Sequence, residues 1–172
     1  MDDAAGEMSA LLQRYYPLLV ARAWADAEAD LGRAIPFDAV GADAITAEIG
    51  ARAAGITATL QDRIARLVNT TAEDPAALDA GLRALGLDAA KAAEIAVTEV
   101  GTVYNRGITL ASVAAGLADV YVTDGDRDPI CAAVHGTYQT VAWAAAHPSG
   151  HPRCTRRFAI APAGRPAGKE IP

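Results

Sequence analysis

The sequence has few cysteines, few aromatic residues and no long apolar run. Two cysteines, Cys131 and Cys154, are too few for a disulfide framework. Aromatic residues make up only 5% of the 172 residues, whereas 52% are hydrophobic, because much of the apolar content is alanine. A core of such small side chains suits closely packed helices in one compact domain.

The sequence also lacks the marks of a membrane or secreted protein. The most apolar early stretch, Leu11 to Trp24, is interrupted by polar and charged residues and a proline, so it falls short of the ~20 apolar residues of a membrane span. Asp2, Asp3 and Glu7 make the start acidic, whereas a signal peptide begins with basic residues. We therefore expect a protein with no membrane partner that acts where it is made or in a particle assembled there.

Positive charge is scarce, except near the C-terminus. The net charge is −6, which argues against a uniformly basic nucleic-acid binder. After residue 148, however, basic residues outnumber acidic ones, and Arg153, Arg156 and Arg157 lie close together. Such a tail could contact DNA phosphates or an acidic partner, and a purely solubilising role is the open alternative.

Residues 1–118 read as a helical domain. Apolar residues recur at helical spacing over about residues 7–31 and 45–67, with Pro17 and Gly55 as candidate breaks. Asp74-Pro75 is typical of the start of a short helix ending at Gly86. The longest helix is expected over about residues 89–115. Its predicted apolar face comprises Ala93, Val97, Val100, Tyr104, Ile108 and Ala111.

A polar ridge runs along the same helix. Glu99, Thr102 and Arg106 are spaced i, i+3 and i+7, which places them on one side. This side is either a solvated face with one ion pair or a polar contact with the C-terminal module, and both interpretations stay open.

Residues 119–160 predict a small Cys/His module, and residues 161–172 a flexible tail. Asp119–Thr123 alternates as in a strand, Asp128-Pro129 starts a short helix, and Val120–Val122 is expected to pair with about residues 157–160. The predicted fold is therefore mainly α: a helical bundle with one long helix and a small C-terminal Cys/His-containing α+β module.

Two pairs of potential metal ligands lie in this module. Cys131 and His135 are separated by four positions, and His151 and Cys154 by three. Because zinc takes four tetrahedral N and S ligands, these four residues predict one structural zinc ion, with Asp128 as the alternative to His135. A disulfide between the cysteines and a metal-free packing role are the other interpretations. His147 is expected to be exposed.

Catalysis is the weaker interpretation of the same residues. A Cys/His pair can act as nucleophile and base, but the spacing indicates no third residue to orient them. The sequence has no Gly-rich phosphate loop, Gly-x-Ser-x-Gly or His-Glu-x-x-His motif. We expect no enzyme, with a zinc-dependent or Cys/His enzyme or a toxin-associated domain as the alternative.

Several short motifs resemble one known family when taken in order. They are Ile95-Ala-Val-Thr-Glu99, Asn105-Arg-Gly107, Val120-Tyr-Val122, Asp124-Gly-Asp126, Cys131, Gly136 and His151-Pro-Arg-Cys-Thr-Arg156. Over roughly residues 75–160, this order is similar to the Mu F-like head morphogenesis (minor capsid) family of tailed phages. The chain departs from that pattern at Asp128, where the family has a first cysteine, and at His135, where it has asparagine. Both replacements can bind zinc.

The resemblance implies a structural role in a virion. Such a protein is assembled in the host cytoplasm, associates with the portal protein, and assists head assembly or DNA packaging and delivery. The major capsid protein and packaged DNA are further expected partners, and no small-molecule substrate is implied.

Overall fold

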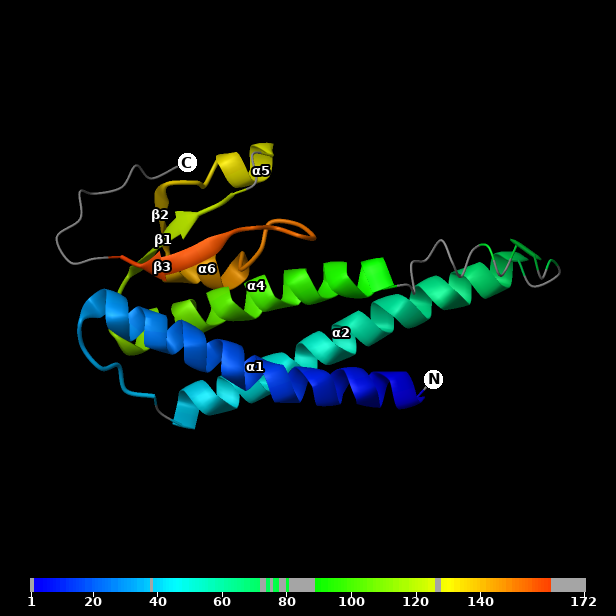
Figure 1. Ribbon diagram of the computed structural model, residues 1–172, viewed down its shortest axis with the longest axis horizontal. Coiled ribbons are helices and arrows are strands. Elements are labelled where there is room, and N and C mark those ends of the chain that lie inside the picture. The colour runs from blue at the N-terminus through cyan, green and yellow to red at the C-terminus, as the bar shows by residue number, and fades with distance from the viewer. Residues whose placement is uncertain are drawn as a thin grey trace.

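Three long helices form most of the molecule, in agreement with the predicted mainly α fold. The computed structural model describes residues 2–37, 39–71, 74, 76, 77, 80, 89–125 and 128–161. The helices are α1 (Asp2–Leu31), α2 (Ala39–Thr71) and α4 (Ala89–Ala114). Figure 1 shows α1 and α2 running in opposite directions, with α4 packed beside α1. None of the described helices is long and apolar enough to cross a membrane.

The two candidate helix breaks do not end their helices. Pro17 lies inside α1, and Gly55 lies inside α2. A proline removes one backbone hydrogen bond and a glycine costs about 1 kcal/mol, and the packing of α1 on α4 and α2 outweighs both. Most of the predicted helix over residues 75–86 and nearly all of the predicted tail lie outside the described residues.

The segment after α1 turns back onto that helix through specific contacts. Gly32 adopts a left-handed conformation (φ 64°), which ends α1 at little steric cost. The Trp24 indole then donates to the Ile35 carbonyl oxygen at 3.0 Å, and the Ile35 amide donates to Glu28 at 2.9 Å. These bonds hold the connection from α1 to α2 against the core.

The C-terminal module is a three-stranded antiparallel sheet with two short helices. Its elements are β1 (Asp119–Thr123), α5 (Pro129–Ala132), β2 (Thr137–Thr140), α6 (Val141–Ala146) and β3 (Arg157–Ile160). β1 lies in the middle, in the order β2-β1-β3. The predicted strand β1 and its pairing with β3 are confirmed, with Val120 opposite Ile160 and Val122 opposite Phe158. The sequence predicted neither β2 nor α6.

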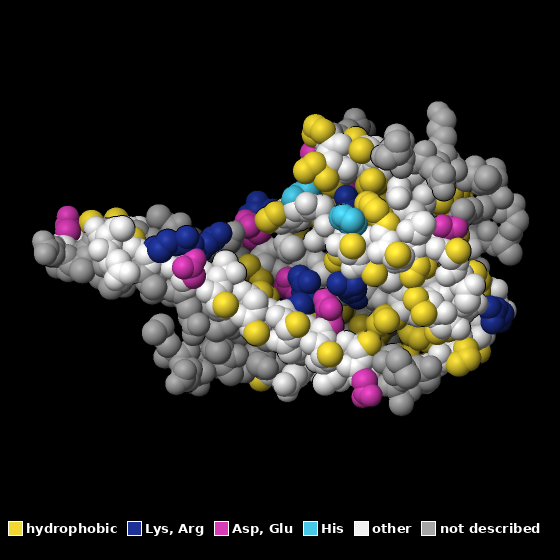
Figure 2. Space-filling model, turned by 180° about the vertical axis from the view of Figure 1, so that it is seen from behind, with side chains coloured by type: hydrophobic (Ala, Val, Ile, Leu, Met, Phe, Trp, Pro, Cys, Tyr) yellow, Lys and Arg dark blue, Asp and Glu magenta, His cyan; other side chains and the backbone are white. Residues whose placement is uncertain are grey.

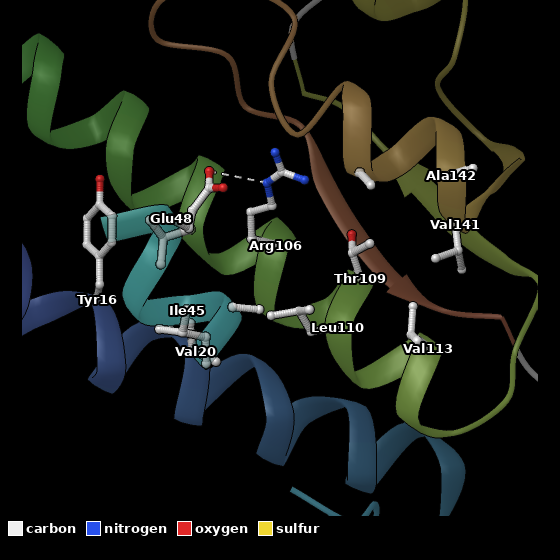
Figure 3. Close-up of a pocket in the computed structure, with 13 residues that line it drawn as sticks. Tyr16, Val20, Ile45, Glu48, Arg106, Thr109, Leu110, Val113, Val141 and Ala142 are labelled. Carbon is white, nitrogen blue, oxygen red and sulfur yellow. Dashed lines mark ion pairs between the residues drawn. The ribbon is translucent and has the colours of Figure 1, made fainter. Parts of the chain in front are cut away.

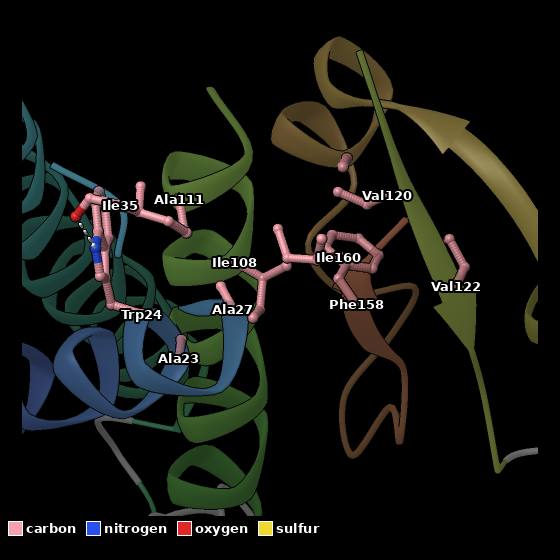
Figure 4. Packing of buried hydrophobic residues seen from close by; sticks show 11 residues of the cluster. Ala23, Trp24, Ala27, Ile35, Ile108, Ala111, Val120, Val122, Phe158 and Ile160 are labelled. Carbon is pink, nitrogen blue, oxygen red and sulfur yellow. Dashed lines mark hydrogen bonds between the residues drawn. The ribbon is translucent and has the colours of Figure 1, made fainter. Parts of the chain in front are cut away.

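One hydrophobic core joins the helices to the sheet. Figure 4 shows Ala23 and Ala27 of α1 against Ile108 of α4, with Phe158 and Ile160 of the sheet approaching the same helix. The core therefore continues across the predicted boundary at residues 118–119. Alanines are abundant here because α1 and α4 lie close together, and Gly107 permits the approach.

The buried side of α4 differs from the predicted apolar face. Ile108 and Ala111 are buried as predicted, but Val97 and Val100 are 54% and 42% exposed. Polar residues are buried instead: Glu99, Thr102, Asn105, Thr109 and Ser112. The spacing of apolar residues predicted the wrong buried face for α4. The face that is buried carries these polar side chains, which find hydrogen-bond partners inside the protein.

Candidate metal centre and its surroundings

Three potential metal ligands converge beside β1. Cys131 lies in α5, while His151 and Cys154 belong to the loop that leads into β3. The Cys131 Sγ lies 3.3 Å from the His151 Nε2 and 3.6 Å from the Cys154 Sγ. The three donor atoms lie within 4.8 Å of one another, and both thiols are buried. This group could hold a metal ion.

Hydrogen bonding fixes the protonation of the histidine. The His151 Nδ1 lies 2.7 Å from the Pro152 carbonyl oxygen, which can only accept, so Nδ1 carries a proton. The Nε2 atom lies 3.0 Å from the Asp128 Oδ2 and 3.3 Å from the Cys131 Sγ. When it carries a proton it donates to Asp128, and when it does not its lone pair would face a metal ion bound here. The carbonyl contact is a typical arrangement behind a metal-binding imidazole.

Asp128 lies beside these three donors but outside the group that lies within 4.8 Å. Its Oδ1 accepts from the amides of Ile130 and Cys131, which caps α5, and its Oδ2 faces His151. Desolvation raises the pKa of Asp128, but hydrogen bonds from Cys131, Ile130 and His151 together outweigh it and lower that pKa. One carboxylate oxygen thus holds the start of α5, while the other contacts the His151 ring.

The spacing of the donors fits a tetrahedral ion. Zinc binds sulfur at about 2.3 Å and nitrogen at about 2.0 Å, so two sulfurs are about 3.8 Å apart, and sulfur and nitrogen about 3.5 Å apart. The two sulfurs lie 3.6 Å apart, the Cys131 sulfur lies 3.3 Å from the His151 Nε2, and the third separation, between Cys154 and His151, is at most 4.8 Å. A small adjustment of the side chains would therefore accommodate such an ion.

The structure places His135 and His147 outside this group. α5 ends at Ala132, but the turn that follows still bonds the His135 amide to the Cys131 carbonyl oxygen at 3.1 Å, so the direction of the His135 ring, and not the spacing, takes it away from the thiols. The exposed His135 ring instead accepts from the Asp124 amide at 3.0 Å. His147 is exposed, as expected, and stacks on Trp143 with the ring centroids 4.7 Å apart. Of the two alternatives for a fourth ligand, the geometry favours Asp128.

The Cys131 thiol has the properties of an inert cysteine. It is fully buried, and burial together with Asp124, Asp128 and Cys154 raises the pKa of the thiol well above its usual range. The thiolate is the nucleophilic form, so a neutral buried thiol reacts poorly. A bound cation would favour the thiolate and make it a ligand.

The three clustered arginines do not form one exposed basic patch. Arg156 is only 3% exposed, pairs with Asp124 at 3.5 Å and donates to the His147 carbonyl oxygen at 3.1 Å. Its position inside the module removes it from the predicted DNA or partner contact. Arg153 and Arg157 are exposed, but Arg153 pairs with Glu94 at 3.1 Å, and Arg157 lies over the Tyr104 ring.

The predicted polar ridge of α4 faces α1 and α2. Glu99 accepts two hydrogen bonds from Arg52 at 2.6 and 2.7 Å and one from Tyr16. Arg106 pairs with Glu48 of α2 at 3.4 Å, and the fully buried Thr102 bonds to its own helix. Glu99 and Arg106 therefore contact α1 and α2, and the prediction of a solvated face is wrong for both residues.

The charges of the ridge support one another. Burial raises the pKa of Glu99, but hydrogen bonds from Arg52 and Tyr16 outweigh it, and the pKa lies below its ordinary value of 4.5. Burial and the Glu99 carboxylate raise the pKa of Tyr16. Glu99 is therefore an anion that two neighbouring helices hold in place.

Asn105 makes the contact with the module that the ridge was expected to make. Its amide nitrogen donates to the carbonyl oxygens of Pro148 at 2.7 Å and Arg156 at 3.0 Å. Its amide oxygen accepts from the Phe158 backbone at 2.9 Å. No partner of this asparagine could be predicted from the sequence, because its partners lie more than 40 positions away.

No protein-family model, curated protein or solved structure matches the chain.

Proposed function

We propose that the chain is a structural component of a tailed-phage head that acts at the portal vertex. The observation that carries this proposal is the convergence of the motifs that resemble the Mu F-like family. Asn105 holds the backbone at Arg156, Asp124 pairs with Arg156, and Cys131 meets His151 and Cys154. These motifs are short and lie apart in the sequence, but their residues contact one another in the fold. This supports the interpretation that the motifs belong to one folded module.

In this proposal the metal is zinc and its role is structural. Two cysteine sulfurs, one imidazole and one carboxylate form a donor set that suits zinc, and four protein ligands close the site as structural zinc sites require. The ion would join α5, through Asp128 and Cys131, to the loop before β3, through His151 and Cys154. That loop contains no helix or strand of its own between residues 147 and 156. The zinc would therefore fix the part of the module with the least regular structure.

The surroundings of the site favour a structural role over a catalytic one or a DNA-binding one. A thiol that is buried and has a raised pKa is a poor nucleophile. Arg156 is buried inside the module, where it pairs with Asp124, and Arg153 pairs with Glu94. Neither the cysteine nor these arginines are free for the alternative functions.

The proposal is tested with the portal protein encoded in the same genome. We expect the purified chain to co-assemble with portal rings, as measured by mass photometry and co-sedimentation. Cys154→Ala should reduce this binding by disordering the module, whereas Arg22→Gln, which changes an exposed side chain of α1, should leave it unchanged. Failure of the folded, metal-loaded chain to bind portal rings at micromolar concentration would overturn the proposal.

A further inference from the structure

A pocket of about 380 Å³ lies between α1, α2, α4 and α6. Its lining contains no cysteine or histidine residue. α1 contributes Tyr16 and Val20, α2 contributes Ile45, and α6 contributes Val141 and Ala142. In Figure 3 the ion pair of Glu48 and Arg106 lies toward one end of the pocket, with the apolar side chains of α6 toward the other. We propose that this pocket binds a small, mainly apolar molecule that carries one carboxylate.

The size and lining of the pocket fit such a ligand. Pockets for small molecules measure about 300–1,000 Å³ and are mainly apolar, with a few polar groups that orient the ligand. Here four helices supply the walls, and the lining is mostly alanine, valine, isoleucine and leucine. Figure 2 shows a hollow face of the molecule in which basic and acidic side chains gather beside hydrophobic ones.

Arg106 supplies the group that selects an anion. A guanidinium carries five N–H donors, and the contact of Arg106 within the described part of the chain is Glu48, 3.4 Å from its Nε. That nitrogen is buried and has no hydrogen-bond partner among the described residues. The Arg106 side chain is 28% exposed, and Arg106 lines the pocket, so a ligand could reach its guanidinium from there. A carboxylate, which accepts two parallel hydrogen bonds from a guanidinium, matches this arrangement.

The neighbouring carboxylate does not favour a cationic ligand. Glu48 already lies between two guanidinium groups, with Arg106 at 3.4 Å and Arg52 at 3.7 Å. Arg106 has Glu48 as its single acidic neighbour among the described residues, and Arg52 directs two hydrogen bonds to Glu99. Arg106 is therefore the cation at the pocket whose acidic contact, among the described residues, is a single carboxylate.

Three probes with the same eight-carbon chain test the proposal: octanoate, octanol and octylammonium. Binding is measured by calorimetry and by saturation-transfer NMR on the whole chain. We expect octanoate to bind about ten-fold more tightly than octanol, because of its charged hydrogen bonds, and octylammonium to bind most weakly. Equal affinities for the three probes, or no octanoate binding at millimolar concentration, would overturn the proposal.

Three variants locate the binding. Arg106→Met should weaken octanoate binding about ten-fold and leave octanol binding unchanged. Ala142→Phe, at an exposed position on α6, should fill the pocket and abolish both, whereas Ala146→Phe, on the same helix but outside the pocket lining, should abolish neither. Octanoate binding that survives Ala142→Phe in a protein with an unchanged circular dichroism spectrum contradicts the proposed site. The pocket lies outside the candidate metal centre, so this result is independent of portal binding.

Discussion

The helical part and the C-terminal module keep their shapes by different means. In the helical part, helices of 26 to 33 residues carry their own backbone hydrogen bonds, and polar side chains such as Glu99 connect helices that are already formed. In the module, no described helix exceeds six residues and no strand exceeds five. Elements this short are unstable alone, so the module depends on the core that it shares with α1 and α4 and on a few polar contacts made by single residues.

Asn105 provides the sharpest test of this difference, because it connects the two parts. Asn105→Leu should lower the free energy of unfolding by about 4 kcal/mol, since one buried and one partly buried carbonyl oxygen and one buried amide lose their partner together. Thr109→Val, one turn further along α4, removes a single bond within the helix and should cost under about 1 kcal/mol. Urea unfolding curves measure both, and equal costs would show that Asn105 is an ordinary buried polar residue.

Glu99 tests the polar contacts within the helical part. Glu99→Gln should cost about 2 kcal/mol, because Arg52 and Tyr16 lose a buried anionic partner while regular helices remain. The folded pKa of Glu99 is lowered, so its stabilising contribution is present above the ordinary pKa of 4.5 and is lost as the pH falls through the folded value. Thermal unfolding between about pH 3 and 6 should therefore show a weaker acid dependence in Glu99→Gln than in the wild type. Parallel pH profiles would contradict this role of Glu99.

Gly107 tests how closely α1 and α4 are packed. A Cβ atom at this position would lie 2.6 Å from the Ala23 Cβ and 3.3 Å from the Val20 Cα, so Gly107→Ala should cost about 1.5 kcal/mol. Gly50 of α2 has open space around it, and Gly50→Ala should stabilise the protein by about 0.7 kcal/mol through helix propensity. Opposite signs in thermal unfolding are expected, and two stabilising substitutions would show that the helices have room to separate.

The smallest effect is expected at the surface of the module. Arg153→Gln removes an exposed ion pair with Glu94 and should change the unfolding free energy by less than about 0.5 kcal/mol. Arg156→Gln removes a buried cation beside Asp124 and should cost clearly more. Chemical denaturation measures the unfolding free energy of both variants. A larger loss of unfolding free energy in Arg153→Gln than in Arg156→Gln would show that the buried polar contacts of the module contribute little to its stability.

The sequence predicted those parts of the fold that follow from local patterns. Alternation identified β1, and a turn residue followed by proline identified the start of α5 at Asp128. The proximity of Cys131 and Cys154 is also confirmed. These features depend on neighbouring residues, whose chemistry can be read directly from the chain.

Other features depended on partners far away in the sequence. The buried face of α4 was misplaced because Glu99 and Asn105 are stabilised by residues more than 40 positions away. β2 was missed because its residues are only partly buried and show no apolar alternation. His135 was assigned as a ligand because its spacing places it one turn after Cys131, but its ring accepts from the Asp124 amide, 11 positions earlier, and does not face the thiols.

We infer that one metal ion fixes the module, and the metal content of untagged protein purified without chelator tests this inference. Elemental mass spectrometry should find about one zinc per chain, with the thiols of Cys131 and Cys154 protected from reagent until a chelator is added. No metal, with both thiols unreactive or reactive regardless of chelator, would contradict the claim and leave Asn105 and Arg156 as the contacts that hold the module.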